Sequence, residues 1–255
     1  MDTFLHPTAI VDASAQIGQG VQVGPYAILG PNVCVGDNTQ IGPHVLIECN
    51  TVVGAGSVIH KGAALGVDPL DLKYGGEETW LEIGDRAVLR EYCTLSRGSA
   101  DRTVIGDDAV LMCYSHVAHD CKIGSHVILS NAANLLGHAE VGDHAIIGGL
   151  TFVNRHCRIG ELAFVGGGFR VARDVPPYVI AGDEPLQITS VNTVALQKRG
   201  YSETAIAHIA EAYRLIHAGK SDLSAAIKKI RANLELTDEL RNILSFIEKS
   251  EKGII

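Results

Sequence analysis

The segment that decides the fold begins at Ile105-Gly106-Asp107-Asp108-Ala109-Val110-Leu111 and ends at Val171. Within it every sixth residue is aliphatic: Ile105, Leu111, Val117, Ile123, Leu129, Leu135, Val141, Ile147, Val153, Ile159, Val165 and Val171. A period of six matches neither the alternation of a strand nor the 3.6-residue period of a helix. It is typical of the hexapeptide repeat of a parallel β-helix, in which each hexad forms one short strand and one turn. Three hexads close one coil, so residues 18 apart are predicted to lie above one another.

The same ladder begins near the N-terminus, runs from Val11 to Leu65, and resumes at Ile83 after an interruption over residues 66–82. A loop of that length without structure of its own is usually functional. A smaller interruption, residues 97–104, adds four residues to the spacing. We therefore predict an all-β left-handed parallel β-helix over residues 1–187 with loop 66–82.

From about residue 190 the apolar period becomes helical, which predicts a C-terminal α-helical domain over residues 188–255. Ser202, Ser221 and Thr237 are the expected N-caps of its helices, and the first of these is expected to end at Gly219. Such a domain can cap the open end of a solenoid.

Composition excludes several classes of function. The formal net charge of −8 argues against general nucleic-acid binding. No apolar run approaches the length of a membrane span, and no signal peptide is recognised. Aromatic residues are only 5% of the chain, as a narrow solenoid interior would require, and its 28 glycines are expected at corners with positive φ. The six cysteines form no CxxC pair, so reduced thiols in a cytoplasmic protein are expected.

The 18-residue period predicts which side chains meet. His119, Gly137 and Arg155 form one expected column, and Asp120, His138 and His156 form the adjacent one. His116 is expected beneath Asn134, Phe152 and Arg170.

These residue types suit acid–base chemistry. Imidazole is a suitable general base near neutral pH, which makes His119 the candidate. Asp120 can hold its tautomer if the two side chains meet, and the Gly137 amide can face an oxyanion. Two other interpretations stay open: outward polar residues at a corner are often only solvated, and clustered histidines can bind a metal.

His-Val-Ala-His-Asp-Cys (116–121), preceded by Asp-Leu-Lys-Tyr (71–74) and followed by Val-Pro-Pro-Tyr (175–178), resembles one family closely. This is the acyl-[acyl-carrier-protein]–UDP-N-acetylglucosamine O-acyltransferase family of lipid A and lipopolysaccharide biosynthesis. The likeness covers nearly the whole chain, including Lys-Arg-Gly-Tyr (198–201). It implies a cytoplasmic homotrimer with active sites between neighbouring β-helices.

The resemblance also implies roles for individual residues. His119 would deprotonate the glucosamine 3-hydroxyl of the UDP-sugar for attack on a 3-hydroxyacyl thioester carried by the phosphopantetheine of acyl carrier protein. Asp120 would orient His119, and the Gly137 amide would bind the oxyanion. The implied substrate-binding residues are Asp71 and Lys73 from a neighbouring subunit's loop, His116, His138, Asn154, Arg155, Gly167 at the acyl-length position, Asn192, Lys198 and Arg199. No metal and no resident cofactor are expected.

Several positions depart from the usual pattern of the family. Asn154-Arg155-His156-Cys157 stands where His-Gln-Phe-Cys is usual, and Leu70, Ser96 and Val194 replace a Gln, a His and an acidic residue. Two alternatives therefore stay open: a paralogous acyltransferase acting on another nucleotide sugar, such as a 3-amino-sugar that would give an amide, and a non-catalytic binding trimer in which Arg155 has disabled the site.

Overall fold

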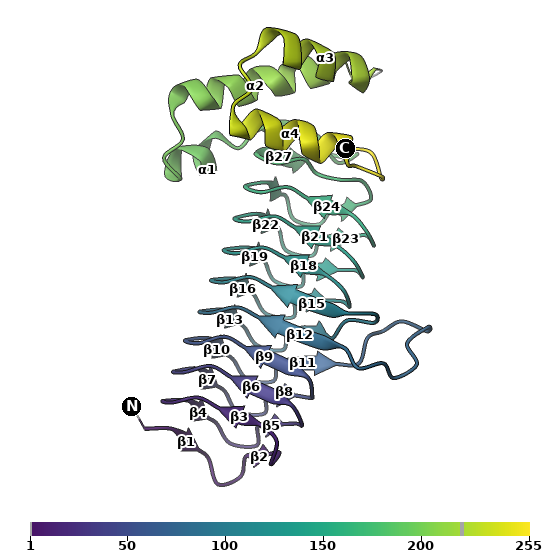
Figure 1. Cartoon of the computed structure of the whole chain (residues 1–255). Coiled ribbons are helices and arrows are strands. Elements are labelled where there is room, and N and C mark those ends of the chain that lie inside the picture. Colours follow the sequence, from purple (N-terminus) through teal and green to yellow (C-terminus); the bar gives the residue numbers. More distant parts are fainter. Residues whose placement is uncertain (1, 220–221) are drawn as a thin grey trace.

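The computed structural model describes residues 2–219 and 222–255, which form a long parallel solenoid with helices across its C-terminal end (Figure 1). Its coils run through three sheets of two- to five-residue strands. The first sheet contains eleven strands in the described chain: β1 (Phe4–Leu5), β4 (Gln22–Val23), β7 (Gln40–Ile41), β10 (Val58–Ile59), β13 (Val88–Leu89), β16 (Val110–Leu111), β19 (Ile128–Leu129), β22 (Ile146–Ile147), β25 (Phe164–Val165), β27 (Val179–Gly182) and β28 (Gln187–Val191).

The second sheet has nine strands among the described residues: β2 (Ile10–Val11), β5 (Ile28–Leu29), β8 (Leu46–Ile47), β11 (Ala64–Val67), β14 (Thr94–Ser96), β17 (His116–Val117), β20 (Asn134–Leu135), β23 (Phe152–Val153) and β26 (Arg170–Val171). The third, with eight in the same ranges, comprises β3 (Gln16–Ile17), β6 (Val33–Val35), β9 (Thr51–Val53), β12 (Trp80–Ile83), β15 (Arg102–Ile105), β18 (Lys122–Ile123), β21 (Glu140–Val141) and β24 (Arg158–Ile159). The predicted solenoid is confirmed.

Strand registers confirm the coil period and both interruptions. Val117 pairs with Leu135, 18 residues later. The offset is 30 where Thr51 pairs with Leu81, across the long loop, and 22 where Leu95 pairs with Val117, across the small insertion. The aliphatic residues of the ladder from Val23 onward point inward and are buried, so one continuous core runs along the solenoid.

The expectation that glycine supplies the positive φ values at the corners is wrong for most of them. Most described residues with positive φ are not glycine but Asn, His, Asp, Tyr and other types, and they recur every six positions. Many glycines instead follow the inward aliphatic residue, where successive coils come very close. A Cβ at Gly106 would lie 2.6 Å from the backbone of Gly124, a distance that real Cβ contacts do not reach. Glycine is required there by coil stacking rather than by φ.

Both insertions into the ladder lie on one edge, which we call the elaborated corner: the turns that join the nine-stranded to the eight-stranded sheet. The long loop between β11 and β12 is shorter than the predicted 66–82, because residues 66–67 and 80–82 belong to these strands; it comprises residues 68–79 and projects from the side of the solenoid (Figure 1). The small insertion, residues 97–104, follows β14 and runs into β15 on the same edge, one coil later. His119 and Asp120 occupy the next turn, between β17 and β18.

One outward face of the solenoid is apolar. The outward residues of the sequence, taken together, are mixed and indicate no such face. Divided by sheet, six consecutive strands of the eleven-stranded sheet present apolar residues, which we call the apolar row: Val58, Val88, Val110, Ile128, Ile146 and Phe164. The sequence did not predict this face, because its apolar residues stand out only when every third hexad, that is, one strand per coil, is compared.

The C-terminal region begins with an antiparallel pair, β27 and β28, that spans the predicted domain boundary. Four helices follow in the described residues: α1 (Thr193–Lys198), α2 (Glu203–Ala218), α3 (Leu223–Asn233) and α4 (Asp238–Glu248). Ser202 caps α2 and the helix ends before Gly219, as predicted. Thr237 stands at the predicted N-cap position of α4, but its side chain makes no capping hydrogen bond. Ser221 lies outside the described residues, and Asp222 is the N-cap of α3. None of the described helices has the length and apolarity needed to cross a membrane.

Candidate active site

The two predicted columns are present on the elaborated corner. The amide of His138 donates to the carbonyl of His119 at 3.0 Å, and the amide of His156 donates to the carbonyl of Gly137 at 3.2 Å. Parallel pairing also places His116 beside Asn134. The phase of the hexapeptide ladder therefore determines which site residues are vertical neighbours.

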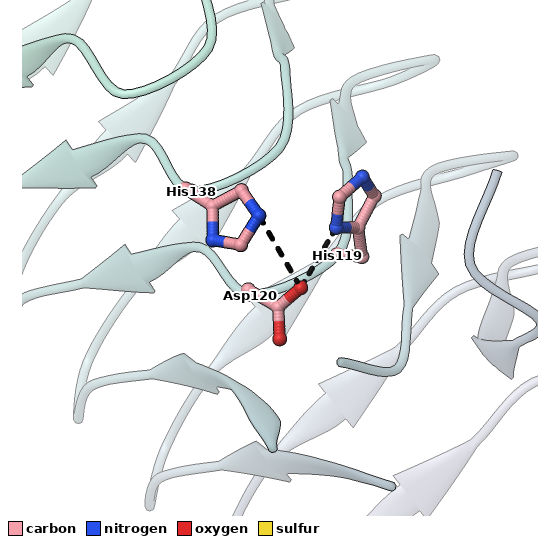
Figure 2. Close-up of side chains that lie close together, drawn as sticks. All are labelled: His119, Asp120 and His138. Carbon is pink, nitrogen blue, oxygen red and sulfur yellow. Dashed lines mark hydrogen bonds and ion pairs between the residues drawn. The ribbon is translucent and has the colours of Figure 1, made fainter. Parts of the chain in front are cut away.

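His119 and Asp120 form the centre of the site (Figure 2). Nδ1 of His119 lies 2.8 Å from Oδ2 of Asp120, and the His119 side chain is 4% exposed. A carboxylate can only accept a hydrogen bond, so Nδ1 carries the proton and Nε2 is the free acceptor. The expected contact between the two side chains is confirmed.

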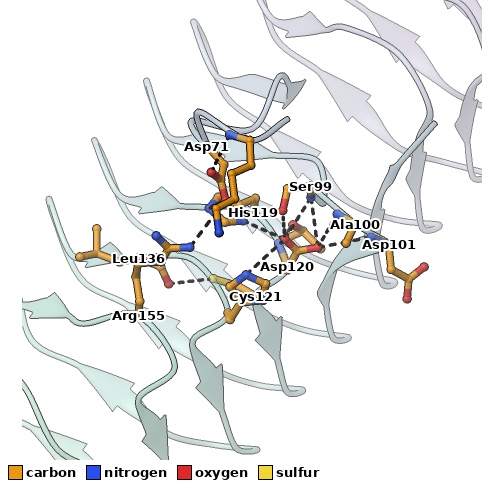
Figure 3. Close-up of polar contacts among 12 residues, drawn as sticks. Asp71, Ser99, Ala100, Asp101, His119, Asp120, Cys121, Leu136 and Arg155 are labelled. Carbon is orange, nitrogen blue, oxygen red and sulfur yellow. Dashed lines mark hydrogen bonds and ion pairs between the residues drawn. The ribbon is translucent and has the colours of Figure 1, made fainter. Parts of the chain in front are cut away.

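The carboxylate of Asp120 is held by more than His119. Its oxygens accept from the amide of Ser99 at 3.0 and 3.1 Å, from the Ser99 hydroxyl at 2.7 Å, and from the amide of Ala100 at 3.3 Å (Figure 3). Burial alone would raise the pKa of Asp120, but the hydrogen bonds from Ser99 and His119 outweigh it and lower that pKa below its ordinary value. Asp120 is therefore a stable anion beside Nδ1 of His119.

Gly137 lies directly over the His119 ring. A Cβ at this position would be 2.6 Å from both Cε1 and Nε2 of His119, so only glycine leaves the ring undisturbed. At the corner between the eight-stranded and the eleven-stranded sheet, the corresponding amide donates to an aspartate one coil above, as Ser125 does to Asp143 at 2.8 Å. Arg155 occupies that place above Gly137, and among the described residues the Gly137 amide has no acceptor. It is available to a ligand.

The long loop brings a second carboxylate to His119. Oδ2 of Asp71 lies 3.9 Å from Nε2 of His119 and 3.6 Å from Nη2 of Arg155. The amide of Lys73 donates to Asp71 at 3.0 Å, and this bond, against the opposing effect of burial and together with the nearby His119 and Arg155, lowers the pKa of Asp71. The resemblance implied a loop from a neighbouring subunit, whereas here the loop of the same chain reaches His119. The reason is that both lie on the elaborated corner.

Other histidines surround this pair. Nε2 of His138 lies 3.8 Å from Oδ2 of Asp120, and the rings of His138 and His156 stack at a centroid distance of 4.5 Å. Nδ1 of His116 lies 2.7 Å from the Thr94 hydroxyl, one coil below. Burial lowers the pKa of His116 and of His138, which favours their neutral forms.

His119, Asp120 and His138 offer donor atoms within 4.8 Å of one another, which is the geometry of a possible metal site. Asp120 is already occupied by Ser99 and by the proton on Nδ1 of His119. A metal between them would displace that proton, so the acid–base arrangement explains the contacts better. That the protein holds no metal remains a prediction.

Three further predicted residues, Asn154, Gly167 and Arg199, are distributed over the three corners of the solenoid. Asn154 is on the elaborated corner and accepts from Nε of Arg170 at 3.3 Å. Gly167 lies over Gly149 at a different corner, between β25 and β26. Nη2 of Arg199 is 2.6 Å from Nδ1 of His144, at the third corner.

Asn192 and Lys198 lie at opposite ends of helix α1. The Asn192 side chain is buried, donates to the carbonyl of Leu162 at 2.9 Å and caps the helix. Lys198 is exposed in the last turn. The structure does not bring these residues, Arg199 or Gly167 to His119 within one chain.

Two contact residues were missed by sequence reasoning. Ser99 holds Asp120, and the buried Arg97 binds the carbonyl of Gly66, Asp68 and the hydroxyl of Tyr74 at the base of the long loop. The only signal was the four-residue change in spacing, which locates the insertion but does not reveal what its side chains contact.

Chemically, the site holds an imidazole between two carboxylates beneath a free amide. A hydroxyl oxygen about 2.8 Å from each partner fits between Nε2 of His119 and Asp71. Such a hydroxyl would lose its proton to Nε2, while the Gly137 amide would face negative charge that develops nearby. This arrangement suits acyl transfer to a hydroxyl.

Comparisons with known proteins agree with this chemistry. The family model described as "Udp N-acetylglucosamine O-acyltransferase; Domain 2" matches residues 174–255, and "Bacterial transferase hexapeptide (six repeats)" matches residues 14–49 and 102–137. An acyl-[acyl-carrier-protein]–UDP-N-acetylglucosamine O-acyltransferase from Trichlorobacter lovleyi is 52% identical over 98% of each chain.

Solved structures show the same relationship. A UDP-N-acetylglucosamine acyltransferase from Bacteroides fragilis superimposes with a TM-score of 0.97 at 37% identity, covering 99% of this chain and 100% of the other. The LpxA structure from Acinetobacter baumannii gives 0.93 at 39% identity over 98% of each.

Proposed function

Because the chain belongs to the acyl-[acyl-carrier-protein]–UDP-N-acetylglucosamine O-acyltransferase family, and is thus an acyltransferase, we propose that it transfers a 3-hydroxyacyl chain to the glucosamine 3-hydroxyl of UDP-N-acetylglucosamine. The donor is the phosphopantetheine thioester of acyl carrier protein, and the reaction opens lipid A biosynthesis in the cytoplasm. The observation that carries the proposal is His119: Nδ1 is tied to Asp120 at 2.8 Å, and Nε2 is free to act as a base.

In the proposed reaction the acceptor hydroxyl lies between Nε2 of His119 and Asp71. Its oxygen attacks the thioester carbonyl carbon while Nε2 takes its proton. The carbonyl oxygen becomes an oxyanion that accepts from the Gly137 amide. The C–S bond then breaks, and the departing sulfur receives the proton from His119. Asp120 stabilises the charged imidazole between these steps.

We further propose a homotrimer with sites between chains. The apolar row would be an unusually long, partly exposed hydrophobic face on a monomer, and such faces mark association surfaces. The predicted substrate residues also lie on all three corners: His119 on one, Gly167 on another and Arg199 near the third. One cleft can include them all only if a neighbouring chain supplies some. His116, His138, Lys73, Asn154, Arg155, Asn192 and Lys198 are proposed to contact substrate in that cleft.

The test is an acyl-transfer assay with UDP-N-acetylglucosamine and its 3-amino analogue, each with a series of 3-hydroxyacyl carrier proteins, read by product mass. We expect an ester product at a rate that depends on His119. Amide product alone would assign the amino-sugar reaction instead. Binding without any product would favour a non-catalytic trimer, and stoichiometric metal in the purified protein would overturn the metal-free mechanism.

A further inference from the structure

We propose that the small insertion, residues 97–104, is the positioning element for both carboxylates that flank His119. This inference rests on the proposed function for its kinetic consequences. Ser99 acts through Asp120 on one side of the imidazole, and Arg97 acts through Asp71 on the other. Neither residue reaches the reacting atoms, so both are positioning residues rather than catalytic ones.

The first arm is a nest for the Asp120 carboxylate. The Ser99 amide and hydroxyl and the Ala100 amide donate to its two oxygens at 2.7 to 3.3 Å, and the Asp101 amide lies at 3.5 Å (Figure 3). Hydrogen bonds to a charged acceptor are stronger than neutral ones and fix its direction. These donors leave Oδ2 of Asp120 facing Nδ1 of His119.

The insertion is what brings these donors within reach. Strand β14 pairs with β17 at an offset of 22 residues, whereas β17 pairs with β20 at 18. The four extra residues therefore lie one coil below Asp120. The backbone amide of Asp120 is fixed as well, since it donates to the hydroxyl of Thr103 at 2.8 Å. The insertion thus holds Asp120 at both its backbone and its side chain.

The second arm is the buried guanidinium of Arg97. It is 5% exposed and binds the carbonyl of Gly66 and the carboxylate of Asp68, with the Tyr74 hydroxyl at 3.3 Å. These three partners flank Asp71 in the sequence. Removing one partner of a buried charge is costly, so Arg97 and the loop base hold each other in place. The loop then presents Asp71 at 3.9 Å from Nε2 of His119.

Ser99→Ala and Arg97→Met test the two arms separately. In Ser99→Ala we expect kcat to fall about tenfold, because one charge-assisted bond is lost. KM for the sugar should stay unchanged, and the acid limb of the kcat profile should move to higher pH. The ¹⁵N resonances of His119 should lose their pure Nδ1–H pattern, and Ser99→Thr should restore it. Ser125→Ala is the control, since it removes a serine hydroxyl at another corner, where only the backbone amide donates to an aspartate.

In Arg97→Met we expect faster amide hydrogen exchange in residues 68–79 and a KM for the sugar raised about tenfold, with the His119 resonances unchanged. Arg97→Lys keeps the charge and guards against loss of folding, and it should give an intermediate result. Arg86→Met, which removes an exposed guanidinium paired with Asp108, is the control.

Unchanged His119 resonances and pH profile in Ser99→Ala, or unchanged exchange of the loop in both Arg97 variants, would overturn the proposal. The resonances and the exchange rates do not depend on turnover. If wild-type protein transferred no acyl group and yet both signals responded as expected, the positioning role would stand and only the proposed function would fail.

Discussion

Nη2 of Arg155 lies 3.6 Å from Oδ2 of Asp71, the same oxygen that lies 3.9 Å from Nε2 of His119. Arg155 stands two coils above His119, where the resemblance to the family leads us to expect glutamine. Its cation therefore reaches the site through Asp71 and balances the second carboxylate. This geometry argues against Arg155 having disabled the imidazole.

We therefore predict that Arg155→Gln remains active. The Arg155 side chain is 54% exposed, and ion pairs of that kind contribute little. The kcat/KM should change by less than about tenfold, mostly through KM for the sugar. Steady-state kinetics with both substrates measure this. A large gain in activity would instead revive the interpretation of Arg155 as an inactivating residue.

His119→Ala should lower kcat by about 10² to 10⁴, because the acceptor hydroxyl loses its base. His116→Ala should be milder, since His116 contacts Thr94 and not Asp120 or Asp71. His126→Ala, an exposed histidine at another corner, is the control and should match wild type. Single-turnover rates separate loss of the chemical step from loss of binding. A His119→Ala protein with near-normal turnover would contradict the proposed mechanism.

Asp120→Asn should lower kcat and should also make the free energy of unfolding less dependent on pH in acid. The folded-state pKa of Asp120 is below its unfolded value of about 3.9. The folded protein thus binds fewer protons there, and the stabilisation is complete above about pH 4 and lost as the pH falls further towards the folded pKa. Asp120→Asn should therefore show a shallower loss of unfolding free energy below about pH 4, and kcat should fall about 10- to 100-fold. Denaturant titrations from about pH 5 downward, through the window below pH 4, measure the first effect, and equal slopes would disprove it.

The sequence predicted vertical neighbours well and lateral contacts poorly. Because every coil repeats after 18 residues, the columns through His119 and Asp120 follow from counting alone. The approach of Asp71 to His119 and the hydrogen bonds from Ser99 to Asp120 could not be derived by counting, because both segments interrupt the 18-residue repeat. The apolar row was readable in principle, but only by following each sheet separately.

Gly137→Ala tests the close contact between Gly137 and the His119 ring, which lies one coil below it. The added Cβ would lie 2.6 Å from two atoms of the His119 ring, so the imidazole must move or the coils must separate. A shift of about 1 Å at a catalytic group costs up to about 10²-fold in rate, and we expect kcat to fall by at least tenfold. Gly182→Ala, whose Cβ would meet its nearest neighbour at 3.5 Å, is the control. Unchanged kcat in Gly137→Ala would show that His119 tolerates displacement.

Val110→Lys tests whether the apolar row is an interface between chains. Val110 is half-buried and points outward from β16 in the eleven-stranded sheet, at the centre of the row. Val104, six residues earlier, is equally half-buried but points outward from the eight-stranded sheet, which makes Val104→Lys a matched control. A buried interface would leave the new ammonium group desolvated and unpaired, so Val110→Lys should dissociate the trimer whereas Val104→Lys should not. Sedimentation equilibrium measures the mass of each. A Val110→Lys protein with the wild-type trimer mass, or a wild-type protein that sediments as a monomer, would place the association surface elsewhere or remove it.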